Sequence, residues 1–163
     1  MYRTINEFVE EWNNESASTL KLLDVLTDAS LGQEVAPGYR TLGRLAWHIV
    51  TSLPVSVFGV EAAQNAETVP SSAKEIADSF RKINASINNA VKSKWTDATL
   101  TEVHAVFGTK MPLEVSLPIV VKHLIHHRGQ MTVLMRQAGL HVPGVMGPSR
   151  EEWVAIGMEA PSL

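Results

Sequence analysis

Apolar residues recur along most of the chain at the three- and four-residue spacing of amphipathic α-helices. Two of these stretches open on the Ser/Thr-x-x-Glu pattern of a capping box, at Thr4–Glu7 and at Ser72–Glu75. The first three apolar stripes are Ile5, Phe8, Val9, Trp12, Leu20, Leu23 and Leu26; Leu42, Leu45, Ala46, Ile49, Leu53, Val57 and Val60; and Ile76, Phe80, Ile83, Ile87 and Val91. Each stripe predicts a helix that turns one face toward a core.

Glycine and proline mark where these helices should end or bend. A cluster that contains Gly32, Pro37 and Gly38 separates the first stripe from the second. Pro54 lies inside the second stripe, and proline lacks an N–H and collides with the carbonyl four residues earlier. We therefore expect a kink in the second helix near Pro54, just past His48.

The sequence changes character between residues 95 and 115. Two short segments, 102–107 and 110–115, flank Gly108 and Thr109, and this arrangement predicts a small hairpin or an extended loop.

A last long helix should follow that loop. We expect it to begin near Ser116, with Pro118 tolerated in its first turn, and to run to about Gln137. A further short helix is expected from the pattern Ser149-x-x-Glu152.

Four long amphipathic helices with little strand predict an all-α fold, an up-down-type four-helix bundle with a small hairpin or extended loop before the last long helix. The chain has 163 residues, of which 45% are hydrophobic, so it is long enough to bury one sizeable core. We expect a single domain over residues 1–163.

Charge and cysteine content exclude several classes of function. The net charge is only −3 and lysines and arginines do not cluster, so no nucleic-acid partner is expected. The chain has no cysteine, which rules out disulfides, thiolate ligands and a cysteine nucleophile, and fits a cytoplasmic protein. No signal peptide is expected at the N-terminus, and residues 45–60 are too few and too polar to span a membrane.

The segment HLIHHRGQM, residues 123–131, places three of the six histidines on the last predicted helix. Because successive helical residues turn by about 100°, His127 falls on the buried face, His123 falls on its flank and His126 points away. Two imidazoles one turn apart in a core each need a donor and an acceptor, unless a divalent cation takes a lone pair from both. The alternative is two structural histidines bonded to carbonyls.

His48 is the strongest candidate for a third ligand. It lies on the second predicted helix, slightly off the apolar stripe, where an inward tilt would bring it to the last helix. Taken alone, it could equally be a half-buried histidine packed against Trp47. Together with the pair His123 and His127 it predicts an open three-histidine site, the arrangement of catalytic rather than structural metals.

Other histidine-bearing bundles fit the sequence less well. Ferritin-like di-iron proteins need Glu-x-x-His pairs, and no glutamate stands three residues before a histidine in this sequence. A haem bundle would leave one member of the HxxxH pair redundant, and a phosphotransfer bundle needs only one exposed histidine.

The segment RLAWHIV around His48, together with His123-x-x-x-His127-Arg128-Gly129-Gln130, resembles the DinB/YfiT-like superfamily of metal-binding four-helix bundles, which is distinct from the polymerase of that name. The resemblance covers nearly the whole chain. It implies that His48, His123 and His127 bind a divalent metal ion, with zinc and nickel the leading candidates, and that the protein pairs as a homodimer.

An open metal site and the resemblance together leave two kinds of function open. The first is a metal-dependent enzyme that acts on a small molecule. Hydrolysis by a metal-bound hydroxide follows from the open site, and S-transfer from a low-molecular-weight thiol such as bacillithiol or mycothiol is what the resemblance implies. The second is a non-catalytic metal-binding or sensing dimer. A metal-free bundle with structural histidines remains the third hypothesis, and the sequence names no catalytic base.

The neighbours of the histidines have separate expected roles. Gln130 lies one turn from His127 and could orient a ligand ring. Arg128 should point toward a helix end, a dimer contact or solvent, and Gly129 should let another helix approach closely. Among the aromatic residues, Trp47, Phe58 and Phe107 are predicted to lie in the core.

Overall fold

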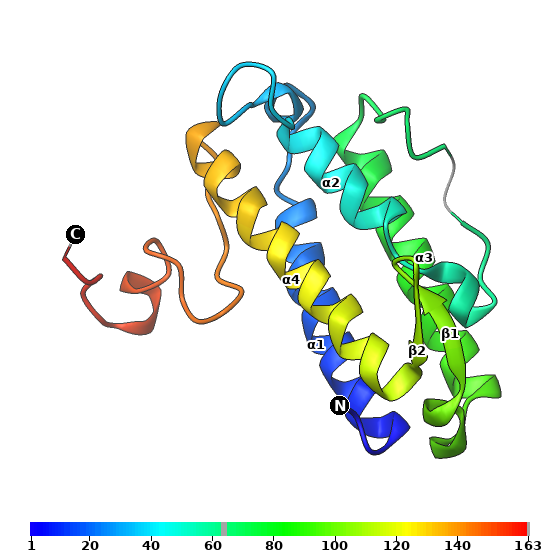
Figure 1. Ribbon diagram of the computed structural model, residues 1–163. Helices are drawn as coiled ribbons and strands as arrows, with labels where there is room; N and C mark the ends of the chain where they lie inside the picture. The colour runs from blue at the N-terminus through cyan, green and yellow to red at the C-terminus, as the bar shows by residue number, and fades with distance from the viewer. Residues whose placement is uncertain (63–64, 163) are drawn as a thin grey trace.

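The computed structural model describes residues 1–62 and 65–162, and this part of the chain forms four α-helices and one two-stranded antiparallel sheet (Figure 1). The helices are α1 (Ile5–Leu23), α2 (Leu42–Thr51), α3 (Ala73–Lys94) and α4 (Leu113–Gln137). The strands are β1 (Val103–Val106) and β2 (Thr109–Pro112), and they form the hairpin that the sequence predicts before the last helix. Four short 3-10 helices complete the elements: η1 (Asp28–Gly32), η2 (Val55–Phe58), η3 (Asp97–Thr101) and η4 (Val154–Ile156).

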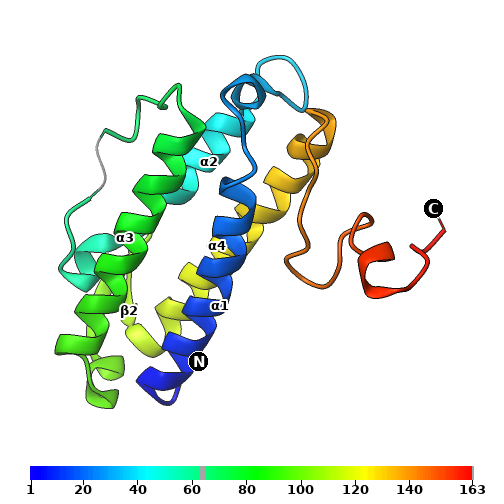
Figure 2. The same cartoon turned by 180° about the vertical axis from the view of Figure 1, so that it is seen from behind.

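The four helices form a bundle in which α1 and α4 run in one direction and α2 and α3 in the other (Figure 1). Helix α1 packs against α3 and α4, as the view from behind shows (Figure 2), and α2 packs against the same two helices. The predicted four-helix bundle is therefore confirmed, but its up-down order is not. The chain returns after α2 to the end of the bundle where α2 began, so α2 and α3 are parallel neighbours.

The early end of α2 explains this return. The helix stops at Thr51 instead of continuing with a kink to Val60, so the predicted kinked helix is wrong. Pro54 has no N–H for the carbonyl of Val50, and its ring also disfavours helical geometry at Leu53. The apolar positions after it stay in the core through η2, in which Val55 and Phe58 are buried.

Helix α4 begins at Leu113, three residues before the predicted Ser116, and Pro118 therefore lies beyond its first turn. Because Pro118 cannot donate, the carbonyl of Glu114 lacks its usual partner four residues on. The backbone N–H of Tyr2 donates to that carbonyl over 3.3 Å, so the N-terminal segment satisfies the group that the proline leaves free.

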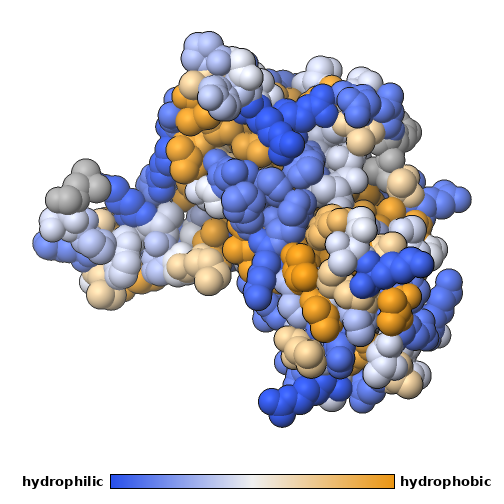
Figure 3. All heavy atoms as spheres, in the orientation of Figure 1, coloured by the Kyte–Doolittle hydropathy of each residue, from blue (hydrophilic) through white to orange (hydrophobic). Residues whose placement is uncertain are grey.

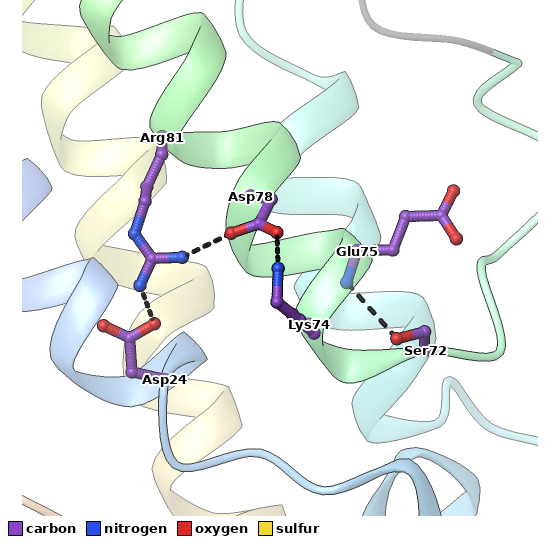
Figure 4. A network of polar contacts seen from close by, with 6 residues as sticks. All are labelled: Asp24, Ser72, Lys74, Glu75, Asp78 and Arg81. Carbon is purple, nitrogen blue, oxygen red and sulfur yellow. Dashed lines mark hydrogen bonds and ion pairs between the residues drawn. The ribbon is translucent and has the colours of Figure 1, made fainter.

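The remaining predicted boundaries can be checked at their caps. Thr4 and Glu7 form the complete capping box at the start of α1, and Ser72 accepts a hydrogen bond from the backbone N–H of Glu75 at the start of α3 (Figure 4). The expected helix after Ser149 is only a turn followed by η4.

Ion pairs on the outside connect the end of α1 to α3. Arg81 of α3 contacts Asp24, which follows α1, and also Asp78, which pairs in turn with Lys74 (Figure 4). All four side chains are substantially exposed, so these pairs add little to the free energy of unfolding.

The core lies between the four helices and also includes Phe58 of η2, Leu100 of η3 and Val106 of β1. Its largest fully buried apolar side chains are Phe8, Trp12, Phe58 and Phe80. Trp47 and Phe58 are buried as predicted, whereas Phe107 has an exposed fraction of 48%, so its predicted place in the core is wrong. None of the helices in the described residues combines the length and the apolar character needed to cross a membrane.

Candidate metal centre

The three histidines singled out in the sequence come together where α2 packs against α4. His48 lies in the last turn of α2, and His123 and His127 lie one turn apart in the middle of α4. His127 is buried, and the other two are half-buried because they lie at the edge of the contact between the helices. The position of His126 is also as predicted, since its side chain is exposed.

The geometry of the three rings suits a single ion. The Nε2 atom of His127 lies 3.1 Å from the Nε2 atom of His48 and 3.1 Å from that of His123. One ligand atom from each ring lies within 4.8 Å of the others. Nitrogen ligands at about 2.0–2.1 Å from a zinc ion, at tetrahedral angles, stand about 3.3 Å apart. Small movements of the rings would therefore place all three nitrogens on one ion.

A hydrogen bond from His127 to Gln130 sets the orientation of the central ring. The Nδ1 atom of His127 lies 2.7 Å from Oε1 of Gln130, and an amide oxygen only accepts hydrogen bonds. Nδ1 therefore carries the proton, and Nε2 presents its lone pair to the point where the rings converge. Metal-bound histidines usually donate this second N–H to an oxygen acceptor, and orienting a ligand ring is the role that the sequence predicts for Gln130.

The electrostatic surroundings keep the three rings neutral. Burial, and after it the charges of His127 and Arg40, lower the pKa of His48 to about 4. Burial is also the first cause that lowers the pKa of His123 and of His127, and the charge of Arg40 acts on both. A neutral imidazole is the form that binds a metal, so these residues are ready to act as ligands at pH 7.

Two residues beside the histidines carry no clear signal in the sequence. Phe107, at the tip of the β1–β2 hairpin, places its ring centroid 4.8 Å from that of His123. Arg40 is exposed, precedes the N-cap of α2 and acts electrostatically on all three histidines. Helical periodicity cannot find residues that reach a site from loops. A bulky residue before glycine in a predicted hairpin turn is the one unusual feature that could have directed attention to Phe107.

Arg128 and Gly129 do not behave as predicted. Arg128 is only 1% exposed, its Nη2 lies 2.5 Å from Oε2 of Glu15, and its Nη1 donates to the backbone oxygen of Glu15 over 3.0 Å. Helix α4 contacts α1 as well as α2, so a residue 100° from His127 is still inside the bundle. Gly129 is exposed, and a Cβ atom there would meet nothing within 4 Å. No helix within the described residues approaches it.

The surface around the site is polar and open. Hydrophilic residues gather over the middle of α4 and the adjoining α2, with apolar residues on both sides (Figure 3). A cavity of about 800 Å³ lies elsewhere, between the segment after α2 and α3, and the three histidines are not among its lining residues. A small molecule that reaches the histidines would therefore bind outside this cavity, against the side chains that surround the histidines.

A helical bundle with three histidines that could hold a metal ion defines the class of this protein. The sequence profile of the DinB family matches residues 1–159, and the chain belongs to that family.

Two relatives support this assignment. The chain is 44% identical to the uncharacterized protein YrdA of Bacillus subtilis (strain 168) over 167 aligned residues, which cover both chains completely. It also resembles the crystal structure of a DinB-like protein from Bacillus cereus ATCC 10987, with 54% identity and a TM-score of 0.83, over 88% of this chain and 99% of that one.

Proposed function

We propose that this protein is a metal-dependent enzyme, of the thiol S-transferase or hydrolase type, whose ion is held by His48, His123 and His127. The observation that carries the proposal is the convergence of the Nε2 atoms of three histidines from two helices. Three histidines leave coordination positions open, which is typical of catalytic sites. Zinc and nickel both suit imidazole ligands.

The chain's own residues supply the holding and orientation of the ion. Nε2 of each histidine provides a lone pair, and Gln130 keeps the proton of His127 on Nδ1. When bound, a divalent ion of this kind lowers the pKa of a water or thiol in an open position.

The absence of cysteine bears on the transferase hypothesis. The reacting sulfur must come from a separate molecule, and we propose that a low-molecular-weight thiol supplies it. In the transfer the thiol loses its proton, sulfur forms a bond to an electrophilic carbon, and the leaving group departs with its electron pair. We further propose a homodimer, which the family resemblance supports, and a cytoplasmic location, which the lack of cysteine fits.

Metal analysis of the purified protein tests the metal-binding part of this proposal. We expect about one tightly held divalent ion per chain, and loss of that ion in His48→Ala, because two ligands on one helix bind much more weakly than three. The matched control is His126→Ala, which removes an exposed histidine outside the converging group and should retain the ion. A metal-free wild-type protein, after exposure to zinc and to nickel, would support the metal-free hypothesis with structural histidines.

Activity measurements then separate the enzyme from the binding protein. The metal-loaded protein is incubated with small thiols and electrophiles, and with esters and amides, and compared with His48→Ala. Turnover that depends on the ion supports the enzyme. If the metal-loaded protein turns over none of these compounds, the result supports the hypothesis of a non-catalytic metal-binding or sensing dimer.

A further inference from the structure

The turn of the β1–β2 hairpin has an unfavourable residue at its first position. Val106 pairs with Thr109, so Phe107 and Gly108 form a two-residue loop, and their φ angles are +49° and +79°. Hairpin loops with positive φ at both positions favour Asn-Gly or Asp-Gly, because a bulky side chain is strained in this region. A phenylalanine here therefore needs another reason, and such outliers point to function.

Packing in the core does not supply that reason. Val106, the residue before the turn, is 2% exposed and anchors the hairpin on the bundle, whereas almost half of the Phe107 side chain is exposed. The ring of Phe107 instead lies beside His123, tilted by 40° to it. The ring is therefore partly exposed and lies beside His123, whose Nε2 atom is 3.1 Å from that of His127.

Since Phe107 is partly exposed and its ring lies beside that of His123, it offers an apolar surface to a molecule that reaches the histidines. Burying such a ring against another flat apolar group is favourable, and stacked or edge-on aromatic pairs gain beyond the area that they bury. Hydrophilic residues gather over the middle of α4 (Figure 3), so a contact with Phe107 would distinguish molecules that carry an apolar group from those that do not.

We infer that Phe107 selects the ligand of the three-histidine site, by packing its exposed ring against an aromatic or other flat apolar group of the molecule that reaches the histidines. This inference rests on the proposed metal-binding function and adds the class of ligand. It makes Phe107 a specificity-determining residue.

Cobalt-loaded protein and two thiols of similar acidity test this inference without requiring turnover. Benzyl mercaptan carries an aromatic ring, 2-mercaptoethanol does not, and each is titrated while the visible absorption bands of cobalt are followed. We expect the wild-type protein to bind benzyl mercaptan about tenfold more tightly than 2-mercaptoethanol. In Phe107→Asn the ratio should fall to about twofold or less, while the cobalt content stays unchanged.

The asparagine variant should fold, because asparagine is well tolerated at this turn position. Phe107→Leu retains apolar area without the ring and should give an intermediate ratio. The matched control is Val103→Asn, which makes the same kind of change at an exposed apolar position of β1 away from the tip, and it should keep the wild-type ratio.

The outcomes separate this inference from the proposal beneath it. Cobalt binding with an equal ratio in the wild-type protein and Phe107→Asn contradicts the role of Phe107 alone. A Phe107→Asn variant that loses cobalt, or binds both thiols more weakly by the same factor, shows that the ring only shields His123. If the wild-type protein binds no cobalt, the proposed metal site fails and this inference fails with it.

Discussion

The three imidazoles of the site differ in how far burial and hydrogen bonds fix their orientation. His127 is buried and its Nδ1 proton is fixed by Gln130, whereas His48 and His123 are half-buried. His127 is also the ring that the other two contact, with both Nε2 distances at 3.1 Å. The orientation of this one ring therefore decides whether the three lone pairs converge.

Removal of the Gln130 side chain should weaken metal binding although Gln130 touches no ion. We expect Gln130→Ala to lower the metal affinity by about tenfold or more, because the ring of His127 loses the partner that fixes its tautomer. Gln130→Glu keeps an acceptor at the same place and should retain the affinity. Competition with a chromophoric chelator measures both variants, and equal affinity in Gln130→Ala and wild-type protein would contradict the assigned role.

Residue periodicity predicted some of this site and missed the rest. The turn of about 100° per helical residue was sufficient to place His127 inward and His126 outward, because it fixes the direction of each side chain relative to the apolar face. It was insufficient for Arg128, since burial on the second side of α4 depends on a neighbour, α1, that the helix's own pattern does not reveal. Hydrophobicity placed Phe107 in the core, but the two-residue turn projects it toward solvent beside His123.

Helix α4 connects the site to the rest of the bundle through successive residues. His127 faces α2, and Arg128, one step further around the helix, reaches α1 and pairs with Glu15. Arg128 is 1% exposed and the Glu15 side chain 16%, so this ion pair is largely removed from water. Such a pair contributes less through its own attraction than through the cost of leaving one member unpaired.

Removing one member of this ion pair should therefore destabilise the protein more than replacing both members with apolar residues. We expect Arg128→Met to lower the free energy of unfolding by about 3 kcal/mol, because the carboxylate of Glu15 is left without its partner in the bundle. The double variant Glu15→Leu/Arg128→Met removes both charges and should recover most of that loss. Urea unfolding measures the two variants, and a double variant no more stable than Arg128→Met would contradict this explanation.

The boundaries of the other elements show which local signals are reliable. Capping boxes predicted the starts of α1 and α3, since each depends on residues a few positions apart. The effect of a proline depends on residues outside its own helix. Pro54 ends α2 instead of bending it, whereas Pro118 is accepted within α4 because the distant Tyr2 supplies the missing donor to Glu114.

At the level of the whole molecule, the sequence did not predict that α2 and α3 are parallel. Apolar stripes give the number of helices and the faces that they bury, but the direction of each helix depends on the connections between them. The end of α2 at Thr51 leaves His48 in its last turn, where its Nε2 atom lies 3.1 Å from that of His127 in the middle of α4. The resulting site opens on the outside of the bundle, with the hairpin tip next to it.

A crystal structure of the metal-loaded protein, with anomalous diffraction collected at the absorption edge of the bound metal, tests the three-histidine site most directly. We expect one strong anomalous peak per chain, about 2.0–2.1 Å from the Nε2 atoms of His48, His123 and His127 if the ion is zinc. A loaded protein whose only peak lies elsewhere, or whose peak is bonded to fewer than all three of these rings, would contradict this expectation.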